Sequence, residues 1–218
     1  LFRSLLLLAA RDVKEGKFSK ARELLRNFPN QGLARYSRPL AGAWIQAGTG
    51  DFEGAIKLLK PLSNENGFVS LMNLHMALLN EQAGNFFEAD KIYKKAIGKI
   101  DEAPLRLLRA RGAFLERRDR KDEARNLYES YLKINPASYL IGYELRRLQE
   151  NRSVRSIADD IISGFAEGMF NLASALPVSR VGAAALLYAR IATYLKPDFP
   201  VAQLLMGDIL DSSGRHGD

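Results

Sequence analysis

Glu15-Gly-Lys-Phe-Ser-Lys-Ala21 begins a pattern that returns three more times along this 218-residue chain. The later copies are Thr49-Gly-Asp-Phe-Glu-Gly-Ala55, Ala83-Gly-Asn-Phe-Phe-Glu-Ala89 and Arg118-Asp-Arg-Lys-Asp-Glu-Ala124. Their closing alanines are 34, 34 and 35 residues apart. A fixed period of this length is typical of helical-repeat proteins, in which each unit is one supersecondary structure.

The residues around each copy predict a helix, a tight turn and a second helix. Glycine at the turn suits the left-handed position that ends the first helix. A small residue upstream is expected to face the closing alanine, so that the two backbones approach closely. A single helix pair cannot bury its apolar face, so the pairs must stack. We therefore predict an all-α fold of stacked antiparallel helix pairs, in which Ala21, Ala55, Ala89 and Ala124 are buried.

These residues resemble the tetratricopeptide repeat, a family of 34-residue helix–turn–helix units. The matching positions are the small residue in the first helix (Ala9, Ala43, Ala77 and Gly112), Gly-x-Phe at the turn, the alanine, a Leu or Tyr four residues later, and Pro136. The resemblance implies a right-handed superhelix with a concave groove. It also implies a non-catalytic scaffold that binds a protein or peptide segment in that groove.

The repeat phase divides the chain into three predicted parts. Residues 1–136 hold four repeats, residues 137–156 hold an unpaired helix and a linker, and residues 157–218 hold a divergent repeat and the first helix of a further one. The unpaired helix could cap the first array, or the linker could let the second array reorient. We expect continuous packing with a kink. Gly214, in this further helix, and His216, in the turn that follows it, complete the predicted pattern.

Charge is distributed unevenly over the chain, whose net charge is +7. Residues 1–155 hold 28 basic and 18 acidic side chains, whereas residues 156–218 hold 4 and 7. Such asymmetry indicates an acidic partner for the first part, or head-to-tail association between copies. A solvated basic surface without a partner is the simpler reading.

The residues for catalysis or metal binding are sparse. The chain has no Cys and two His, and it has no phosphate-binding loop or zinc-protease motif. We therefore expect no enzymatic activity, no metal and no cofactor. Basic and acidic residues alternate over Arg106–Arg125, which favours pairs within helices over nucleic-acid binding. No apolar run reaches the ~20 residues of a membrane span.

The resemblance places seven residues on the groove-facing side of the first helices. They are Leu40, Trp44, Leu74, Leu78, Arg106, Arg109 and Arg117. Apolar positions beside arginines suit a peptide with hydrophobic anchors and acidic residues. Two alternatives stay open, namely burial with internal ion pairs, and self-association through this surface.

Two further expectations concern context. The chain has the character of a bacterial protein of the cytoplasm or periplasm, and we expect it to be a piece of a longer one. The alternative function is that of a regulatory or architectural arm of a larger protein, whose catalytic domain lies outside these residues.

Overall fold

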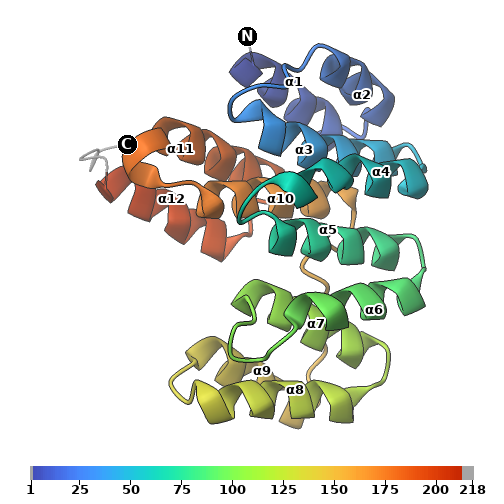
Figure 1. The fold of residues 1–218 in the computed structure, drawn as a ribbon, viewed down its shortest axis with the longest axis vertical. Coiled ribbons are helices and arrows are strands. Elements are labelled where there is room, and N and C mark those ends of the chain that lie inside the picture. The colour runs from blue at the N-terminus through green and yellow to red at the C-terminus, as the bar shows by residue number, and fades with distance from the viewer. Residues whose placement is uncertain (1, 213–218) are drawn as a thin grey trace.

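The described part of the computed structural model, residues 2–212, is helical and contains no strand. Gly214 and His216, with their predicted places in a last helix and turn, lie outside the described residues. Four helix pairs come first, followed by four further helices (Figure 1). The pairs are α1 (Phe2–Lys14) with α2 (Phe18–Arg26), α3 (Ala34–Gly48) with α4 (Phe52–Leu59), α5 (Val69–Gln82) with α6 (Phe86–Ile97), and α7 (Leu105–Arg117) with α8 (Lys121–Ile134). The others are α9 (Tyr139–Gln149), α10 (Ile161–Ala175), α11 (Val178–Leu195) and α12 (Pro200–Ser212), and a short 3-10 helix, η1 (Lys60–Asn64), follows α4.

Stacked antiparallel helix pairs are confirmed, and so is the burial of the alanine in each. Ala21, Ala55, Ala89 and Ala124 are fully buried. Packing requires a glycine at position 112, because a Cβ there would collide with the ring of Tyr128. The small residue thus allows close approach within the fourth pair.

The turns of the repeats use the left-handed backbone that the pattern predicts. Gly16, Gly50 and Gly84 have φ of 72°, 88° and 76°. In the fourth repeat Asp119 occupies the same position and has φ of 60°. A side chain raises the energy of this conformation, since its Cβ crowds the backbone.

Replacing Asp119 by Gly is therefore expected to raise the free energy of unfolding by about 0.5–1 kcal/mol. The reciprocal change, Gly84→Asp, places a side chain in the same conformation and is expected to lower it by a similar amount. Urea titrations followed by circular dichroism measure both. An Asp119→Gly variant with an unchanged midpoint would contradict the strain at this turn.

After the fourth repeat the stack continues by one helix only. Helix α9 packs on α7 and α8 where the first helix of a fifth pair would lie, so it covers this end of the array. The expectation of continuous packing with a kink is wrong, because the segment 150–160 runs back past α7 and α5 (Figure 1). Gln82 holds it by donating a hydrogen bond of 2.6 Å to the carbonyl of Ala158.

Two of the three C-terminal helices, α10 and α11, pack against the first half of the array, and α12 packs on them. Helix α10 contacts α3 and α5, α11 contacts α10 and α1, and α12 contacts α11 (Figure 1). Asp160 caps α10 by accepting a hydrogen bond of 2.6 Å from the amide of Ser163, whose hydroxyl bonds back to the Asp160 amide. This reciprocal cap fixes where α10 begins.

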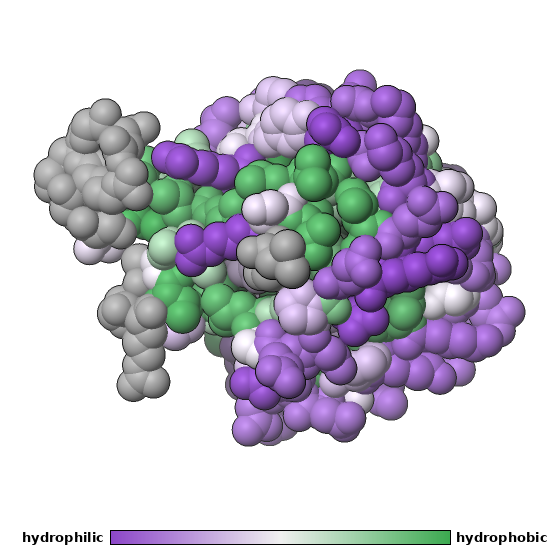
Figure 2. Space-filling view, turned by 90° about the horizontal axis from the view of Figure 1, so that it is seen from above, coloured by the Kyte–Doolittle hydropathy of each residue, from purple (hydrophilic) through white to green (hydrophobic). Residues whose placement is uncertain are grey.

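The end of the molecule formed by α1, α2 and α11 has a hydrophobic and a hydrophilic part. Hydrophobic side chains gather in the middle of this face, and hydrophilic ones border them on the side of α2 (Figure 2). Leu7 and Leu8 of α1 are among the exposed hydrophobic residues. Within residues 2–212, no helix is both long and apolar enough to cross a membrane.

Candidate functional site: the inner face of the repeat array

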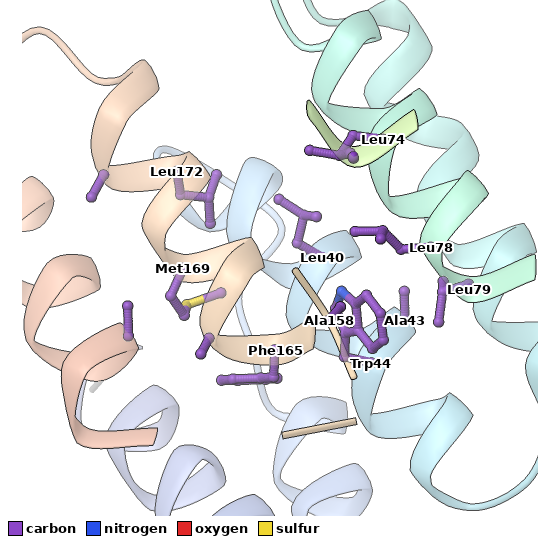
Figure 3. Packing of buried hydrophobic residues seen from close by; sticks show 14 of the residues in the cluster. Leu40, Ala43, Trp44, Leu74, Leu78, Leu79, Ala158, Phe165, Met169 and Leu172 are labelled. Atoms are coloured by element: carbon purple, nitrogen blue, oxygen red, sulfur yellow. The ribbon is translucent and has the colours of Figure 1, made fainter. Parts of the chain in front are cut away.

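The inner face of the second and third repeats is covered by helix α10. Leu40, Trp44, Leu74 and Leu78 are at most 3% exposed. Figure 3 shows Phe165, Met169 and Leu172 on α10, which lies across from α3 and α5. The expectation of an open apolar groove at these four residues is therefore wrong in this structure, because the chain covers them with its own helix.

Gly164 allows α10 to lie close to α3. A Cβ at Gly164 would approach three ring carbons of Trp44 well inside 3.0 Å, a separation that Cβ atoms essentially never show. One turn further on, a Cβ at Gly168 would make ordinary contacts of 3.6–3.8 Å with His75, Leu40 and Trp44. The indole of Trp44 therefore packs directly on the backbone of α10.

A buried polar network joins the same helices. The indole Nε1 of Trp44 donates a hydrogen bond of 3.0 Å to Nδ1 of His75, and Nε2 of His75 lies 3.4 Å from the amide nitrogen of Asn171. Asn171 also donates to Oε1 of Glu167 at 3.0 Å. Glu167 is fully buried, and Arg106 of α7 donates to both of its carboxylate oxygens. Hydrogen bonds thus join α3 to α5 and α10 to α7, and the contact between Asn171 and His75 places the two sets side by side.

Burial lowers the pKa of His75 to about 4, with Glu167 acting in the opposite direction and Arg106 in the same one. The ring is therefore neutral at pH 7, and it accepts the indole hydrogen bond at Nδ1. A neutral, fully enclosed imidazole of this kind serves packing and hydrogen bonding.

The lowered pKa of His75 predicts a pH dependence of stability. The unfolded chain, with a His pKa near 6.5, binds more protons than the folded chain as the pH falls from 6.5 towards 4, so stability is lost over this range. The loss between about pH 7 and pH 5 should be about 2 kcal/mol. Thermal denaturation of the protein and of His75→Gln measures it. A variant with the same pH dependence as the unaltered protein would contradict the assignment.

The three predicted arginines are engaged in ion pairs inside the molecule. Arg106 pairs with Glu167, Arg109 pairs with Glu144 at 2.6 Å, and Arg117 pairs with Glu81. The structure therefore agrees with the alternative that these arginines form ion pairs within the chain. An acidic ligand at these residues would have to displace the three carboxylates.

A recurring arrangement of Tyr, Glu and Arg extends along the inner face. Tyr93 donates a hydrogen bond of 2.6 Å to Glu81, and Tyr128 donates one of 2.9 Å to Glu116. Glu81 then pairs with Arg117, and Glu116 pairs with Arg147. Burial raises the pKa of Glu81, Tyr93 and Tyr128. These contacts connect successive repeats.

Sequence reasoning missed Glu167 and the helix that carries it. A usable signal was present, because residues 161–175 contain a single charged side chain, Glu167. A helix that is apolar on every side belongs in the interior of a protein. Among the described residues, no group of three or more His, Asp or Glu is placed to hold a metal ion.

The fold defines a helical-repeat solenoid whose C-terminal helices pack into its inner face. No protein-family model matches the chain, and no curated protein does. Two solved structures are similar to it. One is MamA (41-end) from Desulfovibrio magneticus RS-1, with 14% identity, a TM-score of 0.37, and coverage of 86% of this chain and 89% of that chain. The other is a monomeric mutant of IFIT1 with Gppp-AAAA, with 14% identity, a TM-score of 0.38, and coverage of 92% of this chain and 44% of that chain.

Proposed function

We propose that this protein is a non-catalytic interaction scaffold whose inner face is shaped to hold an apolar helix, and that it holds α10 of its own chain there. The observation that carries the proposal is α10, a helix of the same chain that lies on this face. In this chain the bound segment is thus internal, and it closes the first half of the array into one packed body.

The contacts of α10 indicate which features a helix needs in order to bind the inner face. Trp44 requires a residue without a side chain at the point of closest approach, which Gly164 supplies. Leu40, Leu74 and Leu78 require apolar side chains, and Phe165, Met169 and Leu172 are buried on α10. Arg106 requires a carboxylate, which Glu167 supplies. The recognised segment is an apolar helix with one small residue and one acid three positions later.

A peptide-binding experiment tests this proposal with the full chain. Phe165→Asp introduces a charge at a fully buried position of α10 and should release this helix from the array. A labelled peptide with the sequence of residues 159–176 is then expected to bind the variant and not the unaltered protein, whose inner face is filled. Ser174→Asp, at an exposed position of α10, is the matched control and should bind no peptide.

Fluorescence of Trp44, the single tryptophan, reports the state of the face. Its emission should shift to longer wavelength in Phe165→Asp and return on addition of the peptide. Circular dichroism shows whether the array keeps its helices, and Gly164→Ala is the milder substitute if it does not. Equal binding of a scrambled peptide would contradict the proposal. The role of a regulatory or architectural arm stays a prediction.

A further inference from the structure

A second surface lies on the opposite side of α3 from α10. On α3, Arg35, Arg38 and Gly42 follow one another at spacings of 3 and 4, so they share one face of the helix. Leu40 and Trp44 lie on the other face, under α10. Arg22 and Arg26, four residues apart on α2, border the same surface. We name this surface, between α2, α3 and α4, the arginine groove.

The groove consists of two adjoining hollows of about 380 and 550 Å³. Arg38 and Leu58 line both hollows. Leu25, Gly42 and Leu58 line the first one, and Leu58 is 42% exposed. The groove therefore offers an apolar recess with guanidinium groups around it.

The four arginines of the groove differ from those of the inner face. None of the ion pairs among residues 2–212 involves Arg22, Arg26, Arg35 or Arg38. Asp51 and Glu65 are carboxylates that lie at the groove, and Glu23 adjoins Arg22 on α2. Asp51 is engaged with the Gln46 side chain and the Gly54 amide, with Arg22 contributing to its lowered pKa, and Glu65 lines the second hollow. The positive charge of the groove is thus largely uncompensated.

Gly42 gives a second reason to regard the recess as a binding surface. A glycine within a helix costs about 1 kcal/mol relative to alanine. A Cβ here would make only ordinary contacts, 3.5 Å from Leu58 and 3.6 Å from Leu25, so packing does not require the glycine. Gly42 is itself buried beneath Leu25 and Leu58, and its missing side chain leaves room between these two leucines at the base of the first hollow.

We propose that the arginine groove binds an acidic segment of a partner protein, with one apolar side chain of that segment in the recess over Gly42. Guanidinium groups bind carboxylates through paired hydrogen bonds, and four of them match a segment with several acids. The apolar recess favours a peptide over single-stranded nucleic acid, since base recognition uses free aromatic faces. Tyr36, beside Arg35, is already stacked on Phe68 with ring centroids 4.3 Å apart.

This inference rests on the scaffold role proposed above but concerns a different surface. A fluorescein-labelled peptide, Gly-Ser-Asp-Glu-Asp-Leu-Glu-Asp-Gly, is the probe, and fluorescence anisotropy with the full chain measures its affinity. Arg38→Gln should weaken binding about tenfold, as loss of a charge-assisted contact implies. A second peptide, in which Ser replaces the single Leu of the probe, tests the apolar recess. Leu58→Ser should weaken binding of the Leu peptide several-fold and leave binding of the Ser peptide unchanged.

Two matched controls lie on α9. Arg146 is exposed and belongs to none of the ion pairs among residues 2–212, and Leu140 is 40% exposed, close to the 42% of Leu58. Arg146→Gln and Leu140→Ser should leave the affinity unchanged. All four variants should keep the emission of Trp44, because α10 is not altered.

Three results would overturn the inference. Arg146→Gln and Arg38→Gln could weaken binding equally, which would mean unspecific attraction by a basic protein. Labelled oligouridine could bind more tightly than the peptide in a manner that depends on Arg38, which would mean a nucleic-acid surface. Sedimentation could show self-association that Arg38→Gln abolishes, which would mean that a second copy occupies the groove. Peptide binding at the groove with no binding of residues 159–176 to Phe165→Asp would instead contradict only the inner-face proposal.

Discussion

Gly164→Ala is expected to lower the free energy of unfolding by about 1–3 kcal/mol, as overpacking of a well-filled core does. Alanine is the better helix former by about 1 kcal/mol, so the substitution would be favourable at an unconstrained position. At Gly164 the added methyl group meets the ring of Trp44. That ring cannot move freely, because it is fully buried and bonded to His75.

Gly168 supplies the matched control for this prediction. It lies one turn further along the same buried side of α10, and its added methyl group would make contacts of 3.6–3.8 Å. Gly168→Ala is therefore expected to leave stability unchanged or raise it by up to about 1 kcal/mol. Urea denaturation followed by circular dichroism measures both variants. If Gly164→Ala were as stable as Gly168→Ala, α10 would not lie against Trp44 as described.

Arg106→Met is expected to cost about 3–5 kcal/mol, because it leaves the carboxylate of Glu167 buried without its cation. Glu167 is 0% exposed, and Asn171 is its remaining hydrogen-bond donor among the described side chains. The double variant Arg106→Met, Glu167→Met should recover most of this loss, since a buried ion pair can be replaced by apolar residues of similar volume.

Arg109→Met is the matched control for the ion pair. Its partner, Glu144, keeps a second cation, because Arg147 lies 3.1 Å from the other carboxylate oxygen. The expected cost is about 1 kcal/mol. Thermal and urea denaturation of the three variants compare the effects. A cost for Arg106→Met no larger than that for Arg109→Met would contradict the account of the buried Glu167.

The repeat array was predictable because its determinants are local. A glycine with positive φ, an alanine and a small residue within one helix pair lie within about one repeat of 34 residues. Asp119 shows how strong the pattern is, since it adopts the glycine conformation at the corresponding turn. Leu40 and Trp44, which the resemblance placed on a groove, lie under α10.

What covers these two residues was not predictable from the same pattern. Gly164 and Trp44 are 120 residues apart, and nothing in the repeat spacing states that the segment after α9 reverses its direction. The irregular stretch 150–160 carries no periodicity that would favour one path over another. Glu167 reaches Arg106 only because the chain takes this path. The sequence pattern around the arginines therefore could not show that their partners are carboxylates of the same chain.

Nuclear magnetic resonance tests the central claim, that α10 occupies the inner face of the array, most directly. The protein contains one tryptophan, so the indole protons can be assigned without ambiguity, and selective labelling of glycine resolves the Hα protons of Gly164. The account predicts strong nuclear Overhauser effects between these Hα protons and the indole of Trp44, together with ring-current shifts of the glycine signals. Gly164 signals at ordinary shifts, without any Overhauser effect to the indole, would contradict it.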